Sequence, residues 1–176
     1  MVTLPAVISS LAKLEELDLD NGNGCEMQLH LSESALLPGS LKMLNLSGAL
    51  AKDSPLPISH LQALKELDLS KFETAMIPAE VFSLQQLQSL RVDYMHLRAV
   101  PDELIRLTNL QTLHACCNFI TTAGWPDLRA MRNLKLVELG NNSLTKFDQQ
   151  LIRSRLPDTT KVDFTNVWDD GRANEE

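Results

Sequence analysis

A cysteine, a histidine and an aspartate occur at spacings that suit a shared surface. His114 and Cys116 are separated by one residue, so on a β-strand their side chains point to the same face, about 6–7 Å apart. Asp93 precedes Cys116 by 23 residues. If the two segments form neighbouring strands, Asp93 lies level with Cys116, about 4.8 Å away. Such a group has the chemistry of a nucleophile, a base and an orienting carboxylate, or, with Cys117, of a metal site.

The surroundings expected for these residues do not favour catalysis. The side chains stand on an open sheet, which offers no closed pocket and no obvious oxyanion hole. The spacing of the cysteines and histidine also matches no familiar zinc pattern. We therefore expect ordinary surface residues, with no catalytic residue, metal ligand or cofactor. An enzyme that uses Cys116, His114 and Asp93 is the remote alternative.

A leucine repeat indicates which elements position these side chains. Leucine accounts for 33 of the 176 residues, and L-x-x-L-x-L begins at positions 14, 41, 64, 87, 110 and 134, with a weaker copy at 159. The L-x-L part has the period of a strand, so its leucines point inward and the intervening residues outward. One unit cannot bury its own leucines. The units are therefore expected to stack, with their strands in one parallel sheet over a continuous core.

A proline pattern runs in phase with the leucines. Pro5, Pro55, Pro78 and Pro101 each lie nine residues before the next repeat start, with apolar residues three and six positions further on. This spacing of three suits a short helix or 3₁₀ turn, and proline is tolerated in a first helical turn. The segments between strands are therefore predicted to return along the opposite side of the sheet.

The complete unit, P-x-x-φ-x-x-L-x-x-L-x-x-L-x-L with φ apolar, resembles the 23-residue form of the leucine-rich repeat family. The resemblance implies an α/β solenoid: a curved parallel sheet of about seven strands, with a convex side of short helices, 3₁₀ turns and loops. It implies one domain over residues 1–176, with an irregular insertion at 21–38 and an acidic tail at 168–176. The residues expected to be buried at the strand centres are Leu17, Leu44, Leu67, Leu90, Leu113, Val137 and Val162.

The chain departs from the family pattern in two places. The family usually has asparagine three residues after the third repeat leucine, but this column reads Gly22, Ala49, Phe72, Met95, Asn118, Asn142 and Val167. We therefore expect packing to hold the turns of the middle repeats. Residues 25–31 alternate between apolar and polar, which is consistent with an added strand.

The resemblance also implies a function, namely protein–protein recognition through the concave face. The 21 outward positions predicted from the register carry eight carboxylates and two basic groups, a net charge of −6. This favours a protein partner with a basic surface, although a solvated sheet face explains the same residues. Arginine and tyrosine are common interface anchors, and both occur mid-array. The predicted partner-binding residues are Glu66, Asp68, Arg91, Asp93, Tyr94, His114, Cys116 and Glu138.

Composition narrows the context. A net charge of −7 argues against nucleic acid and anionic membrane surfaces as partners. Three cysteines, two of them adjacent, indicate a reducing compartment rather than a disulfide framework. We expect a cytoplasmic protein, or one delivered to a host cytoplasm if it is an effector. Two interpretations stay open: an adaptor or scaffold, or the substrate-recruiting or sensing part of a larger protein such as a bacterial effector or immune receptor.

Overall fold

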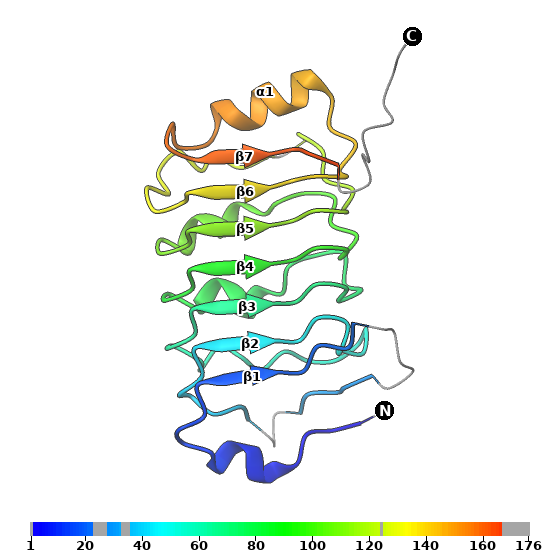
Figure 1. Ribbon diagram of the computed structural model, residues 1–176, viewed down its shortest axis with the longest axis vertical. Coiled ribbons are helices and arrows are strands. Elements are labelled where there is room, and N and C mark those ends of the chain that lie inside the picture. The colour runs from blue at the N-terminus through cyan, green and yellow to red at the C-terminus, as the bar shows by residue number, and fades with distance from the viewer. Residues whose placement is uncertain (1, 23–27, 33–35, 124, 167–176) are drawn as a thin grey trace.

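A computed structural model describes residues 2–22, 28–32, 36–123 and 125–166. These residues contain a parallel sheet in which seven strands follow one another in chain order, one from each repeat (Figure 1). The register is unbroken, because the central residue of each strand lies opposite the central residue of the next. The strands are β1 (Glu16–Asp18), β2 (Met43–Asn45), β3 (Glu66–Asp68), β4 (Ser89–Arg91), β5 (Thr112–His114), β6 (Leu136–Glu138) and β7 (Lys161–Asp163).

The core confirms the repeat register at six of the seven strand centres. The central side chains of β2 to β7 are buried, and each is flanked by two residues that retain solvent exposure. The prediction for Leu17 was wrong, because this side chain is only partly buried. β1 is the first strand of the sheet, so one side of Leu17 lacks the preceding repeat that covers every later strand centre.

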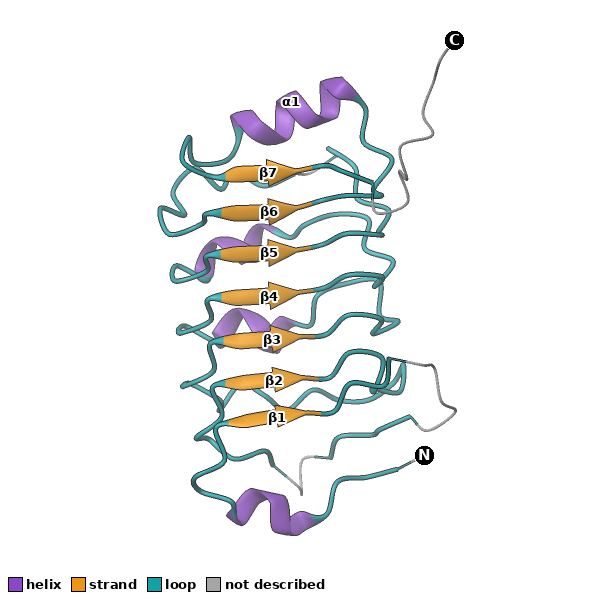
Figure 2. Ribbon diagram, viewed as in Figure 1, coloured by secondary structure: helices purple, strands orange, loops and turns teal. Residues whose placement is uncertain are grey.

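Short helices form part of the segments that return the chain along the opposite side of the sheet (Figure 2). Three 3₁₀ helices start directly after a repeat proline: η1 (Ala6–Ser10), η2 (Ala79–Ser83) and η3 (Asp102–Arg106). The segment after Pro55 departs from this prediction. A second proline follows at position 57, and the Ile58 N–H bonds to the Leu56 carbonyl instead of closing a helical turn. The return before β7 is a true α-helix, α1 (Lys146–Ser154), which begins with a capping box between Thr145 and Asp148.

The turns after the strands are held in two ways, by packing in the middle repeats, as predicted, and by asparagine side chains in the two repeats that follow. Ala49, Phe72 and Met95 are buried, so packing fills this position in the middle repeats. Asn118 and Asn142 instead bind loop backbone with buried side chains. The Asn118 Oδ1 accepts hydrogen bonds from two N–H groups of the preceding repeat, and its Nδ2 donates to three carbonyls.

The N-terminal insertion contributes little regular structure where it is described. Leu29 forms isolated parallel bridges with Val2 and Leu50, and the other described residues of the predicted added strand, 28, 30 and 31, form no strand; residues 25–27 lie outside the described residues. The same holds for Val167 and the acidic tail at 168–176. Within the described ranges, every helix is too short or too polar to cross a bilayer.

Candidate partner-binding face

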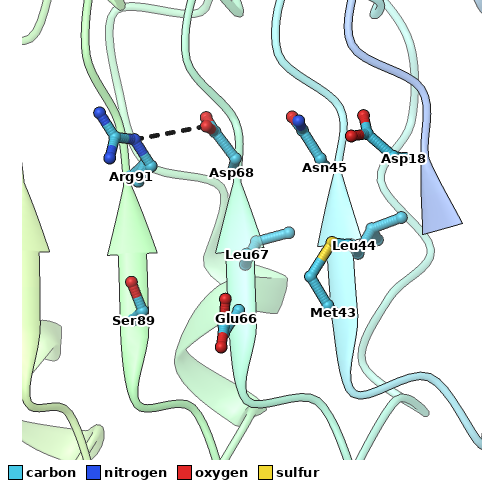
Figure 3. Close-up of a pocket in the computed structure, with 9 residues that line it drawn as sticks. All are labelled: Asp18, Met43, Leu44, Asn45, Glu66, Leu67, Asp68, Ser89 and Arg91. Carbon is cyan, nitrogen blue, oxygen red and sulfur yellow. Dashed lines mark ion pairs between the residues drawn. The ribbon is translucent and has the colours of Figure 1, made fainter. Parts of the chain in front are cut away.

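The outward side chains of neighbouring strands form a shallow hollow on the face of the sheet opposite the return segments. We call this the concave face, defined by the first and third residues of each strand. The hollow has a volume of about 200 Å³ and spans β1 to β4 (Figure 3). One row of side chains across it is Asp18, Asn45, Asp68 and Arg91, and the other includes Met43, Glu66 and Ser89.

A third row of predicted outward positions is buried at four of its seven residues, while Asp20 and Thr165 are exposed and Cys116 is partly buried. Ser47, Ser70, Asp93 and Gly140 are buried, which corrects the expectation that this column faces solvent. The physical reason is the turn that follows: the next residue in five successive repeats has a positive φ, which bends the chain away from the strand direction. The concave face, defined by the first and third strand residues, carries six carboxylates and two basic side chains, a net charge of −4, and Asp20 of the third row is exposed beside it.

Several carboxylates in this face cap their own strands. The Asp68 Oδ1 accepts a hydrogen bond of 2.8 Å from the Ser70 N–H, two residues on, and Asp18 and Asp163 make the same local contact. The hydrogen bonds with Thr165 lower the pKa of Asp163. These turns explain part of the acidic column without any partner. Arg91, His114 and Glu138 take the same position in the middle repeats and do not form this turn.

Arg91 lies between two of the predicted carboxylates. Its Nε is 3.4 Å from the Asp68 Oδ2, and its terminal nitrogen is 3.2 Å from the Asp93 Oδ2. Asp93 is 8% exposed, and its other oxygen accepts a 2.6 Å hydrogen bond from the Cys116 N–H. Burial raises the pKa of Asp93, against the lowering effects of that hydrogen bond and of Arg91. The Arg91 side chain stays 46% exposed, so it remains accessible to a partner.

His114 and Glu138 form a second pair on the concave face. They lie opposite each other on β5 and β6, and the His114 Nδ1 is 2.5 Å from the Glu138 Oε2. The sequence register places both residues correctly on the face. It does not reveal their contact, because that depends on the rotamers of two side chains from adjacent repeats.

The Asp93, His114 and Cys116 group is not arranged as a catalytic triad. Asp93 binds the Cys116 backbone, and the His114 Nδ1 faces Glu138 instead of Asp93. Burial, followed by the charge of Asp93, raises the pKa of the Cys116 thiol to about 11, whereas a nucleophilic cysteine needs a lowered pKa. Within the described ranges, no three His, Cys, Asp or Glu residues are positioned to hold a metal ion.

Tyr94 lies at the carboxyl edge of the sheet, where the chain leaves β4, and it is 43% exposed. Its neighbours there include Glu73, His96 and Phe119, which the sequence reasoning missed. The sequence does contain a pattern that groups these residues: all three are nine residues after a repeat start, and two of them have aromatic rings. These residues lie beyond the ends of the strands, so the strand pattern alone does not predict them.

Comparison with known proteins establishes the family. The profile described as "Leucine-rich repeat region" matches residues 7–175, and the chain belongs to this family. Members of the family are typically non-enzymatic modules that bind other proteins. A search of curated proteins finds no match.

Three solved structures share the fold at low identity. A leucine-rich repeat protein from Leptospira interrogans is 22% identical with a TM-score of 0.53, and 92% of this chain covers 52% of that one. An internalin from Listeria monocytogenes is 15% identical with a TM-score of 0.58, and 94% of this chain covers 58% of it. Internalin C2 from the same species is 22% identical with a TM-score of 0.50, the coverage being 90% and 74%. The chain thus spans little more than half the length of the first two.

Proposed function

We propose that the protein recognises a protein partner through the concave face, and that the partner presents basic side chains to it. The observation that carries this proposal is the carboxylate of Glu66. It lines the hollow beside Met43, it is exposed, and it has no hydrogen-bond or ion-pair partner among the described residues. The unpaired Glu66 carboxylate can therefore form an ion pair with a lysine or arginine of the partner, whose aliphatic part can pack on Met43.

The paired charges complement this acidic region. Arg91 is held by Asp68 and Asp93, and His114 by Glu138, so these side chains are already ordered before a partner arrives. Ordering in advance lowers the entropic cost of binding. Arg91 serves as an anchor on the concave face and the exposed Tyr94 as an anchor at its edge, while Glu66 and Asp68 steer the encounter.

A selection from a random displayed peptide library, with the folded protein as bait, tests the proposal. Enriched peptides should carry more arginine and lysine than the library, and their association should slow as salt rises. A Glu66→Gln, Asp68→Asn variant should bind them with a lower association rate, whereas Arg91→Ala, Tyr94→Ala should raise the dissociation rate. Glu103→Gln, on the return segment η3, is the matched control and should change neither rate. Enrichment without basic residues, or kinetics unchanged in both double variants, contradicts the proposal.

The alternative is that the chain is the recruiting or sensing part of a larger protein. The chain covers only 52% and 58% of two structural neighbours, which is compatible with a longer parent. The concave face then selects the partner and an attached segment acts on it. The single domain over residues 1–176 and the cytoplasmic location remain predictions; cell fractionation and the flanking gene sequence test them.

A further inference from the structure

A second surface, outside the concave face, is formed by the loops that follow β3 to β6. They form an open depression of about 480 Å³ whose lining includes Glu73, Tyr94, His96, Cys117 and Phe119. Two repeat columns supply these residues, because Tyr94 and Cys117 share one repeat position and Glu73, His96 and Phe119 share another. We call the three rings and Glu73 the rim cluster.

The rings of the rim cluster are exposed, unlike the three aromatic side chains of the core. Phe119 is 60% exposed and stacks on His96 with ring centroids 5.8 Å apart and an interplanar angle of 18°. Phe72, Phe82 and Trp125, by contrast, are at most 6% exposed. The core does not need the rim rings, so their gathering at one edge calls for another explanation.

The backbone beneath the rim cluster is held tightly. The Asn118 Oδ1 accepts hydrogen bonds of 3.0 Å from the N–H groups on both sides of His96, those of Met95 and Leu97. The Phe119 N–H donates to the Leu97 carbonyl at 2.7 Å. Tyr94 and His96 have φ angles of 56° and 60°, a conformation that side-chain-bearing residues rarely adopt and that these bonds maintain. The rings are therefore presented on a rigid support.

One carboxylate of the rim cluster is available to pair with a cation. Among the described residues, no ion pair or hydrogen bond engages the Glu73 carboxylate, which is exposed at the wall of the depression. The lining also has one lysine, Lys71, whose Nζ donates to the Gly22 carbonyl at 3.3 Å and not to Glu73, so one basic and one acidic side chain line the depression. A guanidinium suits this site better than an ammonium, because it is planar, stacks on ring faces and donates two parallel hydrogen bonds to a carboxylate.

We propose that the rim cluster binds an arginine side chain of the protein partner, with the guanidinium stacked on the Tyr94 and Phe119 rings and paired with Glu73. This inference rests on the proposed function, because it assigns one specific side chain of a partner that also contacts the acidic concave face. The rim cluster then supplies specificity for arginine over lysine, which a row of carboxylates on an open sheet does not distinguish.

The test is an NMR titration of the isotope-labelled chain with N-acetyl-arginine methylamide, and with the lysine and citrulline analogues. The arginine probe should shift the amide signals of Tyr94, His96 and Phe119 saturably at millimolar concentrations. The lysine analogue should bind about threefold more weakly and the uncharged citrulline analogue about tenfold more weakly. Absence of saturable shifts at the rim, or equal binding of citrulline, overturns the inference.

Variants of exposed residues make the result specific. Phe119→Ala and Glu73→Gln should each weaken the arginine probe at least about threefold. Phe147→Ala, which removes an exposed ring from α1, is the control and should leave the affinity unchanged. Unchanged affinity in both rim variants overturns the inference. The Glu66→Gln, Asp68→Asn variant separates the two proposals: it should weaken the selected basic peptides yet spare the probe at the rim, so each proposal can fail alone.

Discussion

Gly140 lies against the backbone carbonyl of Thr165, one repeat further on, so closely that a Cβ at residue 140 would overlap the carbonyl oxygen. Backbone atoms of a stacked repeat cannot move aside as the end of a flexible side chain can. We expect Gly140→Ala to lower the free energy of unfolding by about 1–3 kcal/mol. Urea unfolding measures this. Gly39→Ala is the control, because nothing lies within 4 Å of that added Cβ, and its effect should stay below about 1 kcal/mol. Equal effects of the two variants would contradict the contact.

Asn118 supports the loops of two repeats. Replacement by alanine leaves buried N–H groups of Met95 and Leu97 without their acceptor. Asn118→Ala should therefore lower the free energy of unfolding by at least about 2 kcal/mol in urea melts. Asn109→Ala removes a single hydrogen bond, from its Nδ2 to the Gln85 carbonyl, at the surface, and should cost less than about 1 kcal/mol. The reverse order of the two variants would show that packing alone holds the turn.

Leu67 tests the continuous core. It is 2% exposed at the centre of β3, so Leu67→Asp places an uncompensated charge among apolar side chains. The expected cost is several kcal/mol against a total stability of about 5–15 kcal/mol, enough to unfold the chain or bring it close to unfolding. Val7→Asp, at a position that is 67% exposed, should leave circular-dichroism melts nearly unchanged. A Leu67→Asp protein that melts like the parent would refute the buried sheet face.

Cys116 is expected to react slowly with alkylating reagents. Its thiol pKa is raised to about 11 by burial and by the charge of Asp93, so only on the order of 0.1% is thiolate at pH 8. In a Cys25→Ser, Cys117→Ser background, the iodoacetamide rate should rise about tenfold per pH unit until the pH nears 11. Rapid alkylation at pH 7 would instead show an activated thiol and revive the enzyme alternative.

The raised pKa of Asp93 gives a pH dependence with a definite sign. Because the pKa is raised above the unfolded value by burial, the folded chain holds this proton more tightly. The contribution of Asp93 to the free energy of unfolding is therefore present at low pH and is lost as the pH rises through the folded pKa. Asp93→Asn should remove this loss. The free energy of unfolding of the variant, minus that of the parent, should therefore be larger at pH 7 than at pH 4. A difference that stays constant with pH, or changes in the opposite direction, argues against a raised pKa.

The leucine periodicity by itself determined the strands, their order and nearly all of their buried centres. This was possible because a repeat solenoid is close to one-dimensional: each unit contacts its sequence neighbours, so spacing along the chain translates directly into position in the sheet. Leu67, Leu90 and Leu113 are buried for the same local reason in three successive repeats. Leu17 is only partly buried although it fits the pattern, because the periodicity does not indicate what covers the first repeat of a stack.

Only the tertiary structure decided how the polar side chains use the positions that the repeat assigns to them. The contact of His114 with Glu138 and the bridge from Arg91 to Asp68 and Asp93 depend on rotamers and charges in neighbouring repeats. The burial of Asp93 and the gathering of rings at the rim depend on the left-handed turns that follow β2 to β6. Backbone dihedrals in such turns are set by contacts such as those of Asn118, made across the stack, and no single repeat encodes them alone.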